Sequence, residues 1–142
     1  MTGTAKSKVV AEAGMAGRFA VVGAIATLTH AGVAVTLLNT NLLNAFPANI
    51  VGFLVAFAVS FSGHHFWSFA ATHTPGQTVR RMRRFFLLAI SGFALNSGVL
   101  ASWLAFTPWP DTLGILFAIA VVPALTFLGA RFWAFSAPQH DL

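Results

Sequence analysis

The chain is poor in the residue types on which most enzymes and metal sites depend. It contains no cysteine and no tyrosine, so disulfides, thiolate nucleophiles and cysteine-ligated metals are excluded. Charged residues make up only 8% of its 142 residues, whereas an ordinary soluble domain has about a quarter. Hydrophobic residues make up 57%, more than a soluble domain of this length could bury. We infer that a lipid bilayer surrounds the chain.

Acidic residues are few, and none of them lies within an apolar run. Glu12, Asp111 and Asp141 all lie outside these runs. A proton-coupled exporter of the small multidrug type usually needs a carboxylate inside the membrane, so that function is disfavoured. The sequence also has no recognisable nucleophile–base pair, Gly-rich phosphate loop or metal cage. We therefore predict that the protein is not an enzyme and carries no cofactor and no metal.

Four long apolar runs are present, at about 19–38, 46–67, 85–106 and 113–133. Each has about 20 residues, which is enough to cross a hydrocarbon core of roughly 30 Å as a helix. Within lipid, a helix satisfies its own backbone hydrogen bonds, so we predict an all-α membrane protein with four transmembrane helices. A cleaved signal peptide is disfavoured for the first run, because the run exceeds the usual length and three more follow it.

The sequence repeats itself at a constant separation of 66 residues. Phe-Trp-Ser-Phe at 66–69 recurs as Phe-Trp-Ala-Phe at 132–135, and Arg18-Phe19 recurs as Arg84-Phe85. Each repeat contains two of the apolar runs, so the fold is predicted to be two tandem helical hairpins. An even number of spans in each repeat makes the two repeats parallel, related by an axis along the membrane normal.

Basic residues alternate along the chain with the predicted spans. They are Lys6, Lys8, Arg18, Arg80, Arg81, Arg83, Arg84 and Arg131. The connections near residues 39–44 and 107–112 contain no Lys or Arg. The positive-inside rule therefore predicts that both termini and the central loop are cytoplasmic. A net charge of +5 distributed in this way indicates topology and lipid contact, and we predict no nucleic-acid partner.

These patterns give the expected domain boundaries. Residues 1–17 form a cytoplasmic N-terminal segment, and the first fifteen of them are expected to be mobile or to lie along the membrane surface. Residues 18–137 form the four-helix domain, with repeats at about 18–71 and 84–137, and residues 138–142 form a C-terminal tail.

Polar groups inside a membrane require an explanation, and three of those inside the predicted spans stand out. His30 and Asn96 are equivalent under the 66-residue separation and lie at equal depth in the first and third spans, and Asn49 lies in the second. Buried polar groups in membranes often mark a substrate path, so we predict that these three line a route for sugar hydroxyls. The alternative is that they only join helices through interhelical hydrogen bonds.

The cytoplasmic helix ends form a second candidate site. Arg18, Arg84 and Arg131 lie at three of these ends, and arginine holds phosphate through a planar, bidentate fork. His65 aligns with Arg131 and is predicted to make a weaker version of the same contact. The alternative is that these residues fix topology and touch anionic lipid headgroups. We predict Trp67 and Trp133 to be interfacial aromatic anchors at the same end.

Two stretches of the chain resemble the GtrA-like family of membrane proteins. Residues 18–23, Arg-Phe-Ala-Val-Val-Gly, followed by Thr27, are similar to the opening of that family. Residues 127–135 are similar to its Phe-x-x-x-Arg-x-Trp-x-Phe element. The family pattern often has Asn before this Phe, where Ser60 and Thr126 stand here, and His65 replaces its Arg in the first repeat.

The resemblance implies a role in cell-surface polysaccharide synthesis. Proteins of this kind are thought to flip polyprenyl-phosphate-linked monosaccharides across the bacterial cytoplasmic membrane, in company with a glycosyltransferase. The alternative is a membrane anchor or scaffold that recruits such a glycosyltransferase. Four helices enclose little space, so we also expect a homodimer or a higher oligomer, surrounded by membrane lipids.

Overall fold

The structure, a computed structural model, describes residues 2–68 and 75–136, with side chains for 3–67, 79–80 and 83–124. Over these residues the chain forms four α-helices and a π-helical turn. They are α1 (Thr2–Asn39), α2 (Ala45–Gly63), η1 (His64–Ser68), α3 (Pro75–Phe106) and α4 (Asp111–Ser136). The described part of the chain contains no strand, so the all-helical prediction is confirmed.

The helices have the length and composition of membrane spans. Three apolar helical segments of 37, 23 and 24 residues, in α1, α2 with η1, and α3, are long enough to cross a bilayer. In α4, Asp111–Ala124 forms a shorter apolar helix. Large apolar side chains also cover the outer surface, as Leu28 and Leu88 show at 72% and 70% exposure. Such a surface is stable in lipid, and the chain is therefore a membrane protein.

The turn between α1 and α2 is closed by a residue in the left-handed region. Asn41 has a φ of 55°, a conformation that Asn tolerates better than most residues. The chain reversal lets the N–H groups of Leu42 and Leu43 donate to the carbonyl of Leu37, which satisfies the last turn of α1. The helices of this hairpin consequently run back along each other.

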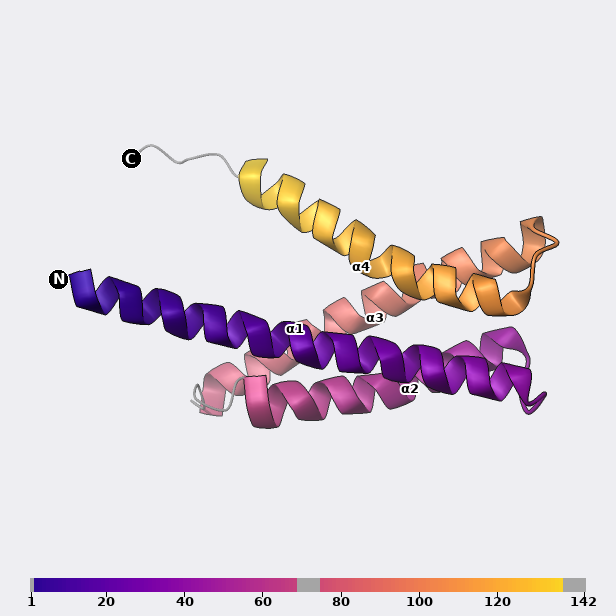
Figure 1. Cartoon of the computed structure of the whole chain (residues 1–142), viewed down its shortest axis with the longest axis horizontal. Coiled ribbons are helices and arrows are strands. Elements are labelled where there is room, and N and C mark those ends of the chain that lie inside the picture. Colours follow the sequence, from indigo (N-terminus) through magenta and orange to yellow (C-terminus); the bar gives the residue numbers. More distant parts are fainter. Residues whose placement is uncertain (1, 69–74, 137–142) are drawn as a thin grey trace.

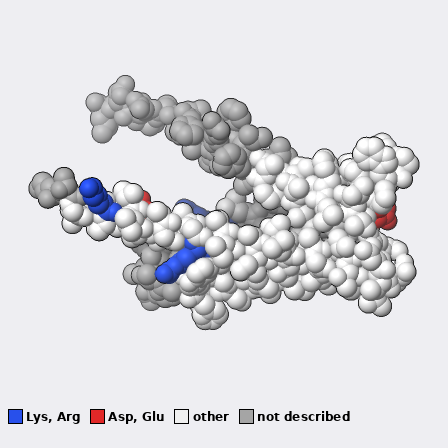
Figure 2. Space-filling model, viewed as in Figure 1, with Lys and Arg blue, Asp and Glu red and all other residues white. Residues whose placement is uncertain are grey.

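The two hairpins lie side by side with the same direction (Figure 1). The start of α1 and the end of α4 lie at one end of the molecule, and the α1–α2 and α3–α4 turns lie at the other. We call these the basic end and the turn end, because the basic end carries Lys6, Lys8, Arg18, Arg80, Arg83 and Arg84. Figure 2 shows no Lys or Arg on the visible face near the turn end. Which end faces the cytoplasm stays a prediction.

Two segments expected outside the helices are helical. Residues 2–17 continue the first span as part of one 38-residue helix; whether they lie along a membrane surface stays a prediction. The arginines at 80–84 belong to α3, which begins at Pro75, instead of forming a loop. In both cases a membrane-spanning helix already supplies the nucleus, and extending a helix is far easier than starting one.

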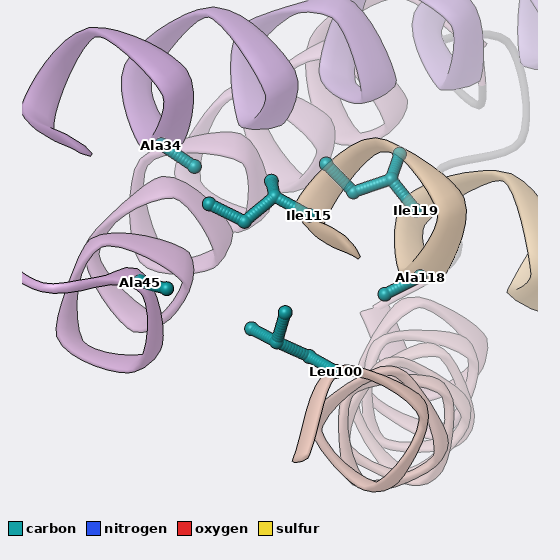
Figure 3. Packing of buried hydrophobic residues seen from close by; sticks show 6 residues of the cluster. All are labelled: Ala34, Ala45, Leu100, Ile115, Ala118 and Ile119. Atoms are coloured by element: carbon teal, nitrogen blue, oxygen red, sulfur yellow. The ribbon is translucent and has the colours of Figure 1, made fainter. Parts of the chain in front are cut away.

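A small apolar cluster joins all four helices toward the turn end (Figure 3). Its members are Ala34, Ala45, Leu100, Ile115, Ala118 and Ile119, all buried. The four side chains of Ala34, Leu100, Ile115 and Ala118 are fully enclosed. The cluster lies between the turns and the polar residues described next, so it closes the bundle on that side.

Candidate functional site

The three polar residues predicted inside the spans meet in one hydrogen-bonded group, here called the polar triad. Asn49 of α2 donates from Nδ2 to Oδ1 of Asn96 on α3 over 2.6 Å. Its Oδ1 is left to accept from Nε2 of His30 on α1 over 2.9 Å. The residues are 1%, 4% and 8% exposed, respectively. Asn49 is therefore the hub that links three helices. The interhelical hydrogen bonds considered from sequence as the alternative are present.

Glycine at position 52 makes the close approach of α1 and α2 possible. A Cβ at Gly52 would lie 2.8 Å from both the ring carbon Cδ2 and the backbone oxygen of His30, and 3.0 Å from Cβ of Ala34. Backbone atoms cannot move aside as the end of a flexible side chain can. Gly52 thus fixes His30 at the distance from α2 that the bond to Asn49 requires.

A cavity of about 240 Å³ extends from the polar triad toward the basic end. All four helices contribute to its wall. Its polar members are Thr27, His30, Ser60 and Asn96, and its aromatic members are Phe53, Phe57, Phe85 and Phe93. The amide N–H groups of Asn96 have no hydrogen-bond partner among the described residues. They remain able to donate to a group that enters the cavity.

Aromatic rings form the side of the cavity between α2 and α3. The rings of Phe53 and Phe93 stack with centroids 4.2 Å apart. Nearer the basic end, the rings of Phe57 and Phe85 lie 6.1 Å apart. Such pairs contribute to packing beyond their area. They hold α2 and α3 together without adding polar groups, so the cavity offers a few polar contacts on an apolar wall.

The basic end places two of the predicted arginines at the surface. Arg18 lies over the ring of Trp67, with its guanidinium carbon 5.7 Å from the ring centroid, a cation–π contact. Trp67 reaches α1 from η1, and single π-helical turns occur frequently at functional sites. Arg84 is exposed one residue before Phe85 of the cavity wall. Phosphate binding by Arg18 and Arg84 stays a prediction.

The histidine pair of η1 packs among aromatic rings. His65 is half-buried and stacks on Phe61, with centroids 6.2 Å apart. His64 is buried, and its ring stacks on Phe19 at 4.4 Å. Phosphate binding by His65 stays a prediction. The side chains of Arg131 and Trp133 lie outside the described residues, although α4 carries both positions toward the basic end.

Sequence reasoning did not assign the cavity wall. Phe53, Phe57 and Ser60 fall at the i, i+4 and i+7 positions of one α2 face, so helical periodicity could have grouped them. It could not have shown that this face meets α3. Within the described part of the chain, no three His, Asp or Glu side chains gather in a way that could hold a metal ion.

Comparisons with known proteins identify a family but no individual relative. No curated protein matches the chain, and no solved structure matches it. A family model described as GtrA/DPMS, transmembrane domain, matches residues 18–135. This family suggests a part in glycosylation or lipid-linked sugar pathways, and its members are generally non-catalytic membrane proteins. Since the match covers most of the chain, the protein belongs to the GtrA/DPMS transmembrane-domain family.

Proposed function

We propose that this protein moves a polyprenyl-phosphate-linked monosaccharide across the bacterial cytoplasmic membrane without catalysing a reaction. The observation that carries the proposal is the cavity that extends from the polar triad toward the basic end. Arg84, which directly precedes Phe85 of the cavity wall, suits a lipid phosphate, and the triad supplies hydrogen-bonding groups at a depth where lipid offers none. The apolar wall suits the isoprenoid part of such a lipid.

The size of the cavity supports a small headgroup. Its volume of about 240 Å³ is below the roughly 300–1,000 Å³ of sites for drug-sized ligands. A single sugar ring is a better match for this space than an oligosaccharide. The isoprenoid tail would then stay outside, against the exposed apolar faces of the helices.

The topology in this proposal is the one predicted from charge. The basic end faces the cytoplasm, and the two hairpins act as parallel repeats within a homodimer or a higher oligomer. Transport runs downhill, because the polar groups described here include no intramembrane carboxylate for proton coupling. Consumption of the sugar outside the cell keeps its concentration low there and so makes net transport outward.

The test uses purified protein in liposomes that carry a polyprenyl-phosphate hexose on one leaflet, with sugar-free polyprenyl phosphate as the comparison lipid. We expect sugar-dependent crossing that falls about tenfold in Asn96→Leu, because that change removes the amide N–H groups that can donate to a sugar in the cavity. Arg84→Gln and Arg131→Ala should lower crossing of both lipids.

Ser102→Ala is the matched control for Asn96→Leu. Ser102 lies exposed on the same helix, and its hydroxyl donates to the carbonyl of Gly98, so its loss should leave crossing unchanged. Helix content and a single peak in gel filtration establish that each variant is folded. If folded wild-type protein gives no crossing above protein-free liposomes, the proposed function is wrong.

A scaffold for a glycosyltransferase is the second candidate, and the start of α3 favours it. Helix α3 begins ten residues before Phe85 and carries Arg80 and Arg83 exposed on this extension. A projecting basic helix is a suitable surface for an acidic partner. Replacing Arg80, Arg81 and Arg83 by Gln should then abolish co-purification of the enzyme, while His30 and Asn96 variants should retain it.

A further inference from the structure

One hydroxyl on the cavity wall is not used by the protein itself. The cavity is lined by two hydroxyl-bearing side chains, Thr27 and Ser60. Thr27 Oγ1 donates to the carbonyl of Gly23 over 2.8 Å, as hydroxyls in helices commonly do. The Ser60 hydroxyl has no hydrogen-bond partner in the described part of the chain. It is therefore free to bond a molecule in the cavity.

Ser60 lies at the mouth of the cavity, beside the start of the third span. Phe85 packs against Phe57, with centroids 6.1 Å apart, and against His64, at 5.1 Å. Ser60 falls between Phe57 of α2 and His64 at the start of η1, about one turn from each. Its hydroxyl consequently lies at the level of Phe85, which directly follows Arg84 in the chain.

The polar triad lies much deeper than Ser60. Arg84 and Asn96 are separated by twelve residues of α3, which is about 18 Å along a helix. This distance exceeds the length of a hexose phosphate. A phosphate held at the level of Arg84 would therefore leave the sugar nearer to Ser60 than to Asn96.

We propose that Ser60 recognises a hydroxyl of the sugar while Arg84 holds the phosphate, before the sugar moves on to the polar triad. This inference rests on the proposed function and adds a specificity-determining residue to it. Two stations follow: a mouth where phosphate and sugar are recognised together, and the triad, which the sugar reaches only after the phosphate leaves Arg84.

The experiment follows crossing in proteoliposomes for wild type, Ser60→Ala and Ser91→Ala. The probes are polyprenyl-phosphate glucose, galactose and mannose, the monodeoxy derivatives of whichever of these crosses fastest, and sugar-free polyprenyl phosphate. In wild type, removing the hydroxyl that Ser60 contacts should slow crossing about fivefold. Ser60→Ala should slow the parent sugar lipid by a similar factor and show no further loss with that deoxy derivative.

Ser91→Ala is the matched control, because it makes the same Ser-to-Ala change at a hydroxyl that donates to the carbonyl of Leu87 over 2.8 Å and is not part of the cavity wall. It should keep the wild-type ratios across the whole series. If Ser60→Ala also keeps the wild-type rates and ratios, the assignment of Ser60 is overturned while transport stands. If wild type moves none of the lipids above protein-free liposomes, the proposed function is overturned and the inference with it.

Discussion

The two hairpins use equivalent positions for opposite purposes. Under the 66-residue separation Asn49 of α2 corresponds to Ile115 of α4, and both are almost completely buried, at 1% and 0% exposure. In the first hairpin this position is the hub of the polar triad. In the second it belongs to the apolar cluster. One pair of helices therefore supplies the hydrogen-bonding hub, and the other seals the bundle beside it.

The difference explains why Asn96 bonds across to the other hairpin. His30 finds its partner, Asn49, on the helix with which it forms a hairpin. Asn96 is equivalent to His30, but its own hairpin offers only Ile115 at the partner position. It bonds to Asn49 instead. The missing polar residue in the second hairpin thus couples the two hairpins to each other.

The largest effect on stability should come from Gly52, where α1 and α2 approach each other closely. Gly52→Ala would bring a Cβ against the backbone of His30, and we expect a loss of about 3 kcal/mol in the free energy of unfolding. Ala118→Gly, the reciprocal change in the second hairpin, should cost about 1–2 kcal/mol, from lower helix propensity and the loss of one buried methyl. Unfolding in mixed micelles, followed by circular dichroism, measures both. Equal losses would show that the hairpins pack alike.

The polar hub should have the next largest effect. Asn49→Leu removes two interhelical hydrogen bonds, each contributing up to about 1.7 kcal/mol in membrane proteins, so we expect a loss of about 2–3 kcal/mol. The matched change Ile115→Leu alters only the shape of an apolar side chain and should cost less than about 1.5 kcal/mol. The same unfolding measurement applies. A cost for Asn49→Leu no greater than that for Ile115→Leu would remove the hub role.

A smaller loss of stability should follow from His30→Asn, which gives the first hairpin the residue that the second has at the equivalent position, 96. His30→Asn shortens the side chain so that it no longer reaches Asn49, and the bond of Asn49 to Asn96 remains. We expect a loss of about 1 kcal/mol, the contribution of one bond. Unfolding of His30→Asn in the Asn49→Leu background should show no further loss, because the partner is already absent. An additive loss would contradict the pairing.

The smallest effect should come from the basic end. Trp67→Leu removes the ring beneath Arg18 and should cost about 0.5–1 kcal/mol. Phe66→Leu is the control, because Phe66 is adjacent and 76% exposed. Thermal unfolding of the two variants in detergent should separate them by a few degrees. No separation would mean that Arg18 and Trp67 do not stabilise the junction of α1 and η1.

The sequence predicted the helices and the residues of the triad but not their bonding. Span lengths and hydropathy are local properties, so four apolar runs became four helices. His30 and Asn96 stood out through the repeat. Asn49 could be noticed only as a polar residue within a span, because the equivalent position in the second repeat is the apolar Ile115. Its role depends on which faces of α2 and α3 meet, and helix-packing geometry is not written in local periodicity.

Two other features lay beyond sequence reasoning for similar reasons. The π-helical form of η1 has no sequence pattern that distinguishes it from the α-helix before it. The cavity arises where four helices of ordinary composition diverge toward the basic end, so its wall combines residues as distant as Thr27 and Pro123. Helical periodicity groups Ser60 with Phe57. It does not show that the Ser60 hydroxyl is free while that of Thr27 bonds to its own helix, because this depends on side-chain rotamers.

The apolar cluster near the turn end has an electrical consequence. In the proposed transport, water in the cavity would carry the aqueous phase inward to the polar triad, and the insulating part of the protein would narrow to the layer around Leu100 and Ile115. In a membrane under voltage the potential drop concentrates across that layer, where moving one elementary charge involves about 2.3 kcal/mol per 100 mV. An anionic headgroup would sense little of the voltage in the cavity and most of it on passing Leu100.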